Sequence, residues 1–278
     1  MKFGLVLVLL ASLQFPLQLA YADTFQPPIP GGIFTFKLPA GATAVSYRDK
    51  PVFLHEGYAL VAVPMNVSPG THELTIHTNG ENQMYSFEVQ PHTYTEQHIT
   101  IKNEALVSPP KEVQERITKE AIRQRGLYAA HLPDHSVSGG FEKPLQGITT
   151  SLFGHKRFFN GKARNPHSGL DIAGPTGAPI AAAGGGVITL ADDLYFNGNT
   201  IFIDHGRGLI TMYCHMSELL VSEGERVEKG QTIGLVGATG RATGPHLHWT
   251  VSLNGTRVDP LRFTTALNQV IAITGEEG

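Results

Sequence analysis

The stretch TIFIDHGRGLITMY, residues 200–213, decides the fold class. Two runs rich in β-branched and aromatic residues, 200–203 and 209–213, flank the turn-forming segment Asp204-His205-Gly206. Apolar runs of this length, separated by turn residues, are typical of neighbouring buried strands. The runs 187–190 and 232–236 repeat the pattern on either side. We therefore predict an all-β domain around this stretch.

Glycine marks how far this domain extends. Nineteen of the 31 glycines lie between residues 145 and 263. Glycine adopts positive φ without steric cost, so it concentrates where strands are joined by tight turns. We expect residues 137–278 to form a Gly-rich antiparallel β domain with its core at 145–263.

The region before it shows a second β pattern. Between residues 32 and 103, short runs such as 33–38, 58–63 and 72–76 are broken by the turn signals Pro69-Gly70 and Asn79-Gly80. Strands of this length and spacing are typical of a small β-sandwich. We predict an N-terminal β domain at 23–107.

A polar segment separates the two β regions. Ser108 followed by Pro109 resembles a helix N-cap with proline at the first helical position. Residues 111–130 carry many charges among a few apolar side chains, as a surface helix does. We predict a helical connector at 108–136, whose helix ends near Gly126 and is followed by a loop.

Residues 1–22 are predicted to be a secretory signal peptide. Lys2 precedes an apolar run at 3–13, and Ala20-Tyr21-Ala22 fits a small-residue cleavage site. The apolar run is shorter than the roughly 20 residues that a membrane-spanning helix needs. We expect a periplasmic or secreted protein with no transmembrane segment after signal removal.

Composition excludes several classes of protein. Hydrophobic residues make up 41% of the chain, too many for a disordered chain. The net charge of -3 makes nucleic acid an improbable partner, because phosphate contact needs a basic face. The single cysteine allows neither an internal disulfide nor a thiolate zinc cluster. Any metal site must therefore use histidine and carboxylate.

Five residues of the C-terminal domain offer such a site. His246 and His248 are two apart in a strand-like run, so their side chains point to the same face. His167 and Asp171 add an imidazole and a carboxylate, and His215 adds another imidazole. Three protein ligands and an open position for water define a catalytic zinc site. Because five candidates exceed three ligands, one or two histidines remain for proton transfer, and spacing alone does not say which.

Each of these motifs also has a structural interpretation. A lone H-x-H pair in a β protein is usually no metal site, and only the joint occurrence of the motifs favours one. We expect His205 to stabilise a turn and Cys214 to be a small buried residue rather than a nucleophile. The sequence contains no nucleophile elbow, phosphate-binding loop or dinucleotide-binding fingerprint.

With these motifs the chain resembles the lysostaphin/LytM-type (M23) zinc metallopeptidases, in the Gram-negative periplasmic form with an N-terminal β domain. The resemblance covers about 145–263. It rests on motifs in family order: Ser151-Leu152-Phe153-Gly154, Pro166-His167-Ser168-Gly169-Leu170-Asp171, Pro175-Thr176-Gly177-Ala178-Pro179-Ile180, Asp204-His205-Gly206, Tyr213-Cys214-His215-Met216-Ser217, Thr243-Gly244-Pro245-His246-Leu247-His248 and Val258-Asp259-Pro260.

The resemblance implies a role for each candidate. His167, Asp171 and His248 would ligate one Zn²⁺ per chain, and His215 and His246 would be the two catalytic histidines that do not bind metal. The family hydrolyses peptide cross-links of bacterial peptidoglycan, and in Gram-negative bacteria the expected bond joins D-Ala to diaminopimelate. Zinc-activated water would attack the scissile carbonyl while one histidine acts as general base; which one stays open.

Two alternatives and one departure accompany this hypothesis. The chain could instead be a non-catalytic activator of cell-wall amidases, although such relatives lack some ligands, or a glycan-binding module. Some family members have a tyrosine shortly before the H-x-x-x-D motif, whereas this chain has Phe158-Phe159-Asn160 and Arg164 there. The N-terminal domain is expected to act as a spacer or to regulate access to the site.

Overall fold

The computed structural model describes residues 25–130 and 139–275. The expected signal peptide at 1–22 and most of the loop after the connecting helix lie outside the described residues. Within the described ranges, no helix has the length and apolar character required to cross a membrane.

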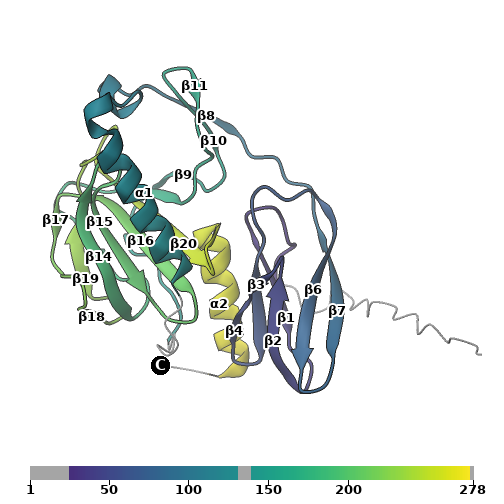
Figure 1. Ribbon diagram of the computed structural model, residues 1–278. Helices are drawn as coiled ribbons and strands as arrows, with labels where there is room; N and C mark the ends of the chain where they lie inside the picture. Colours follow the sequence, from purple (N-terminus) through teal and green to yellow (C-terminus); the bar gives the residue numbers. More distant parts are fainter. Residues whose placement is uncertain (1–24, 131–138, 276–278) are drawn as a thin grey trace, which may run out of the picture.

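The N-terminal region is a sandwich of two small sheets (Figure 1). Phe34 stacks on Phe87, and Phe36 stacks on Tyr85, with ring centroids 4.4 and 4.7 Å apart. Successive side chains point to opposite faces of a strand, and in strand 33–37 both faces are buried: Phe34 and Phe36 fill the sandwich, whereas Ile33 belongs to the core shared with the C-terminal region. One sheet has the order β1 (Ile33–Lys37), β5 (Tyr58–Ala62), β4 (Phe53–His55); the other has the order β3 (Lys50–Pro51), β2 (Ala42–Tyr47), β6 (Gly70–Thr78), β7 (Asn82–Val89).

The chain then leaves the sandwich and contributes a strand to the C-terminal region. Strand β8 (Glu96–Ile99) pairs in parallel with β10 (Lys156–Phe159), which pairs antiparallel with β11 (Lys162–Ala163). Gln97 and Arg157 of this small sheet contact Ser151 and Asp171 of the C-terminal region, so a segment from the N-terminal half takes part in building the surroundings of the site.

An eight-stranded sheet forms the centre of the C-terminal region, as the all-β prediction requires. Strand β16 is buried at every position and pairs with β15 on one side and β20 on the other. The order is β18 (Arg226–Val227), β14 (Gly186–Leu194), β15 (Gly198–Asp204), β16 (Leu209–Met216), β20 (His246–Leu253), β12 (Leu170–Ala173), β9 (Thr149–Ser151), with β21 (Thr256–Val258) paired to β20. A separate sheet has the order β13 (Pro179–Ala181), β19 (Thr232–Leu235), β17 (Glu218–Leu219).

The connecting helix is present, but both of its predicted ends are wrong. Helix α1 (Gln114–Ala129) follows the 3₁₀ turns η2 (Glu104–Leu106) and η3 (Lys111–Val113), and no side chain caps its start. It continues past Gly126 because Tyr128 is buried against the sheet, with its ring 5.1 Å from that of Phe202. In Figure 1 the helix crosses over the strands of the central sheet.

A second helix was not predicted from the sequence. Helix α2 (Pro260–Thr274) begins where Asp259 Oδ1 accepts from the backbone N–H groups of Leu261 and Arg262. Its apolar side, which includes Phe263 and Leu267, is buried in the same core cluster as side chains from the N-terminal sandwich. Figure 1 shows α2 between the two regions, where it joins them.

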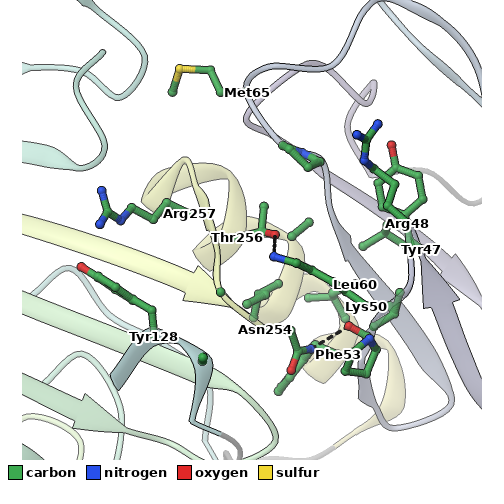
Figure 2. Close-up of a pocket in the computed structure, with 18 of the residues that line it drawn as sticks. Tyr47, Arg48, Lys50, Phe53, Leu60, Met65, Tyr128, Asn254, Thr256 and Arg257 are labelled. Atoms are coloured by element: carbon green, nitrogen blue, oxygen red, sulfur yellow. Dashed lines mark hydrogen bonds between the residues drawn. The ribbon is translucent and has the colours of Figure 1, made fainter. Parts of the chain in front are cut away.

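The junction also leaves a groove of about 820 Å³ (Figure 2). The hairpin of β20 and β21 contacts the sandwich there: Asn254 Nδ2 donates to Pro51 O at 2.9 Å, and Lys50 Nζ lies 3.5 Å from Thr256 Oγ1. No histidine or carboxylate lines this groove, so the larger cavity is not the one that holds the candidate chemistry.

Candidate metal centre

Three of the five candidate residues converge on one point. Asp171 in β12 and His248 in β20 are direct partners across the two paired strands. Asp171 Oδ1 lies 2.7 Å from His248 Nδ1 and 3.0 Å from His167 Nε2, and the two nitrogens are 3.0 Å apart. Among the described residues these three form the one His/Cys/Asp/Glu group that could hold a metal ion.

In His167 and His248, the hydrogen bond made by the ring nitrogen that faces away from Asp171 decides whether the nitrogen that faces Asp171 carries a proton. His167 Nδ1 lies 2.7 Å from the carbonyl oxygen of Leu152, which can only accept, so this nitrogen carries the proton. His248 Nε2 lies 3.1 Å from Thr250 Oγ1, which can accept a hydrogen bond from its N–H group. Both inner nitrogens then present lone pairs beside the carboxylate oxygen. Three converging electron-pair donors suit a divalent cation, and two imidazoles with a carboxylate are a donor set that zinc accepts.

The carboxylate is held ionised by its neighbours. Burial alone raises the pKa of Asp171, but its close contacts with the His167 and His248 side chains outweigh this effect and hold that pKa well below its usual value. Burial lowers the pKa of His248 to about 4, although the neighbouring Asp171 carboxylate opposes this effect. The two groups are therefore an anion and a neutral imidazole at neutral pH, the forms that bind metal.

Arg157 is a site residue that the sequence did not reveal. Its guanidinium donates to Asp171 Oδ2 at 2.5 Å and to Ser151 Oγ at 3.2 Å. It directly precedes Phe158-Phe159-Asn160, the stretch where some family members have a tyrosine, but no spacing rule singles it out, because its position depends on the pairing of β10 with β8. It fixes the carboxylate so that Oδ1 faces the two histidines.

The strand from the N-terminal half supports this arrangement. Gln97 in β8 accepts with its Oε1 from Ser151 Oγ at 3.0 Å and from Arg157 Nε at 3.2 Å. Ser151 Oγ in turn lies 3.0 Å from His167 Nδ1. A chain of side-chain contacts therefore connects β8 to a metal-facing imidazole.

His215 and His246 lie next to the cluster but outside it. Their rings are 4.8 Å apart, and the His215 ring is 6.2 Å from that of His248. His215 Nδ1 is 2.8 Å from Thr239 O, and His246 Nδ1 is 2.8 Å from Gly244 O. Each Nδ1 therefore donates to a carbonyl, which leaves each Nε2 with a lone pair.

His215 is also held in an unusual backbone conformation. Its φ is 66°, in the left-handed region that residues other than glycine seldom adopt, while its amide N–H donates to Asn197 O. Burial, followed by the nearby imidazoles of His246 and His248, lowers the pKa of His215 to about 3. The ring stays neutral, and a strained residue with a perturbed pKa is typical of functional sites.

A cavity of about 380 Å³ opens over this group. Its lining includes His167, His215 and His248, together with Gln124 of the connecting helix. The volume is within the usual range for a small-ligand pocket. The site can therefore admit a short stretch of peptide next to the three donors.

His205 and Cys214, for which the sequence predicts structural rather than catalytic roles, are both buried. His205 is fully buried and its Nδ1 lies 2.7 Å from Gly185 O, so it connects the Asp204-His205-Gly206 turn to the segment that precedes β14. Cys214 is buried too, and burial raises the pKa of its thiol to about 12, so no thiolate is available as nucleophile.

Comparisons with known proteins agree on one family. Residues 165–260 match the sequence profile of peptidase family M23. Two relatives match stretches of similar length. Peptidoglycan DD-endopeptidase ShyC of Vibrio cholerae is 46% identical over 110 residues, 40% of this chain and 25% of ShyC. DD-carboxypeptidase/endopeptidase Mpg of Neisseria meningitidis is 44% identical over 95 residues, 34% of this chain and 22% of Mpg. The chain thus spans about a quarter of the length of these curated relatives.

A solved structure extends the match over most of the chain. The crystal structure of a candidate M23 peptidase from Pseudomonas aeruginosa superposes with a TM-score of 0.71 at 36% identity. The match covers 87% of this chain and 96% of that one, so it includes the N-terminal region as well as the metal centre. This chain therefore belongs to peptidase family M23.

Proposed function

We propose that this protein is a zinc-dependent endopeptidase that hydrolyses peptide cross-links of bacterial peptidoglycan. The observation that carries the proposal is the convergence of two imidazole lone pairs and a carboxylate oxygen within about one ligand shell, beneath an open cavity. The relatives that share this part of the chain are a peptidoglycan DD-endopeptidase and a DD-carboxypeptidase/endopeptidase.

His167, Asp171 and His248 would hold one Zn²⁺ per chain, through Nε2, Oδ1 and Nδ1. When bound, zinc would act as a Lewis acid on the scissile carbonyl and lower the pKa of a bound water. Arg157 keeps Asp171 oriented and the outer hydrogen bonds keep both imidazoles in the right tautomer. Elemental analysis should find one zinc in the wild type and none in His167→Ala or Asp171→Ala.

His215 and His246 are the residues we assign to proton transfer. Each has Nε2 free to accept, because its Nδ1 already donates to a carbonyl. One would take the proton of the attacking water and pass it to the leaving amine; the other would orient the water or the developing oxyanion. The scissile C–N bond breaks as the amine gains that proton, so atoms and charge balance across hydrolysis.

The wider assignment follows from the proposed substrate. A peptidoglycan hydrolase works outside the cytoplasm, which agrees with the signal peptide predicted at 1–22, and we propose a periplasmic or secreted location. We also retain the proposed division into an N-terminal β domain at 23–107, a connector at 108–136 and a peptidase domain at 137–278. An amidase activator or a glycan-binding module would have no need of the complete donor set.

Digestion of purified sacculi, followed by mass spectrometry of the products, tests the proposal. The wild type should release cross-linked dimers as monomers, and chelation should stop the reaction. His215→Ala and His246→Ala should each lower the rate about 10²–10⁴-fold, while the exposed His98→Ala serves as the matched control. Zinc-loaded wild type that leaves every cross-link intact would reject the proposed activity.

A further inference from the structure

The cavity over the metal centre is lined by four arginines and by no acidic residue. They are Arg157, Arg164, Arg241 and Arg257. This is unexpected in a chain with a net charge of -3, in which acidic residues outnumber basic ones. Positive charge is therefore locally in excess at the cavity, although the chain as a whole is acidic.

Arg241 is the most enclosed of the four. Its guanidinium carbon lies 4.7 Å from the ring centroid of Phe159 and 4.5 Å from that of Phe196, so the two rings hold it between them. Burial, and then the neighbouring charges of Arg157 and Arg164, lower its pKa to about 10. At neutral pH it remains a cation that is desolvated and repelled by its neighbours.

Arg164 is only partly used by the protein. One of its terminal nitrogens donates to Val107 O at 2.6 Å, whereas its buried Nε has no hydrogen-bond partner. Within the part of the chain that the structure describes, neither Arg164 nor Arg241 forms an ion pair with a carboxylate. Arg157 differs, because its charge is matched by Asp171.

A desolvated cation such as Arg241, next to a half-buried second cation and without a counter-charge, is costly unless an anion joins the pair. Removing a charged group from water is unfavourable, and an arginine recovers that cost best through bidentate hydrogen bonds to a planar anion such as a carboxylate. Aromatic rings on both sides fix the guanidinium plane of Arg241 in advance, so little freedom is lost when the anion binds.

We propose that Arg241 and Arg164 bind the carboxylate carried by the carbon next to the leaving nitrogen of the substrate. This inference rests on the proposed function and specifies its substrate. In a D-Ala–diaminopimelate cross-link the scissile nitrogen is attached to a carbon that bears a free carboxylate, so the anion lies two bonds from the bond to be cut. Arg157 links the arginine group directly to the metal-facing carboxylate of Asp171, which places the anion site beside the reacting centre.

The same recognition would serve a second substrate. A terminal D-Ala–D-Ala peptide also has a carboxylate on the carbon next to its scissile nitrogen. An enzyme that reads this carboxylate should therefore remove a terminal D-Ala as well as open a cross-link, whereas it should discriminate against any peptide whose equivalent carboxyl is blocked.

A pair of synthetic cross-linked stem-peptide dimers tests the proposal. They differ only in that this carboxyl is free in one and a carboxamide in the other. Losing charge-assisted hydrogen bonds in a buried site should lower kcat/KM of the wild type for the amide about 10–100-fold. In Arg241→Gln and Arg164→Gln the acid-to-amide ratio should fall toward 1, while Arg241→Lys keeps part of it. Arg125→Gln, an exposed arginine of the connecting helix outside this cavity, is the matched control.

The outcomes separate the inference from the function. Equal hydrolysis of acid and amide by the wild type would overturn the inference and leave the endopeptidase assignment standing, and so would a full preference retained in both Gln variants. Failure of the zinc-loaded wild type on both dimers would instead reject the proposed function. Zinc content and the fluorescence of Trp249, the single buried tryptophan, verify that each variant is folded and loaded.

Discussion

His205 should make the stability of the C-terminal region depend on pH. The ring is fully buried, with Nδ1 2.7 Å from Gly185 O, Nε2 2.7 Å from Thr211 Oγ1 and an edge contact to Phe141. Burial lowers its pKa to about 4, and the bond to Gly185 only partly opposes this effect. In the unfolded chain the same ring would have a pKa near its ordinary 6.5. We therefore consider how the free energy of unfolding changes as the pH falls from 6.5 to about 4.

The sign follows from proton uptake. Below pH 6.5 the unfolded chain binds a proton at His205 and the folded protein does not, so acid favours unfolding. The stabilisation is complete above pH 6.5 and is lost as the pH falls toward the folded pKa of about 4. Each tenfold difference in proton affinity corresponds to about 1.4 kcal/mol, so His205 alone should cost about 2 kcal/mol of stability at pH 5 and about 3 kcal/mol at pH 4.

Urea unfolding of wild type and His205→Gln at several pH values measures this quantity. Trp249 reports the transition, because it is the only tryptophan and is buried in the same region. Other titrating groups contribute equally to both proteins, so the difference between their free energies of unfolding isolates His205. The wild type should be the more stable at pH 7.5, and its advantage should shrink by about 2 kcal/mol at pH 5. A difference that stays constant with pH would refute the reasoning.

Three further predictions follow from close packing. Gly169→Ala should weaken zinc binding at least about tenfold, because a Cβ there would lie 2.7 Å from His248 Cε1 and 2.5 Å from Trp249 O; unchanged affinity in a chelator competition would contradict this. Tyr128→Ala should lower the free energy of unfolding in urea by about 3 kcal/mol, because the buried ring anchors the connecting helix. Arg123→Ala should lower it by less than about 1 kcal/mol, because the ion pairs of Arg123 are exposed. Equal losses in the two variants would contradict the anchoring role of Tyr128. Cys214 should react with a thiol reagent only after unfolding, because it is buried and its thiol pKa is about 12; labelling of the native protein would disprove the buried position.

The sequence predicted the strands of the central sheet better than the partners of its side chains. Residues 200–203 and 209–213 are strands because β-branched and aromatic residues recur between turn residues, a local signal. The contact of Asp171 with His248 depends on β12 pairing with β20, across 77 positions, which no local period encodes. Only the resemblance to a family connected the two before the structure did.

Helix α2 was missed for a related reason. Asp259-Pro260 is a strong N-terminal signal, since Asp259 accepts two hydrogen bonds from the first turn. As a sequence motif, however, the pair indicates only the end of the peptidase domain. The helix matters because its buried side, including Phe263, belongs to a core that also contains Phe53 and Leu60 of the sandwich. That shared core could not be inferred from either region alone.

The N-terminal half acts on the metal centre through positioning rather than chemistry. Gln97 holds both Ser151 and Arg157, and these two contact His167 and Asp171 respectively. None of the contacts from β8 supplies an electron pair to the metal position, so β8 fixes the orientation of the donors without being one of them. A spacer would need no such connection. The expectation that the N-terminal region influences the site therefore gains a physical route, which runs through the side chains that orient the ligands and is independent of whether the region also restricts access of the polymer.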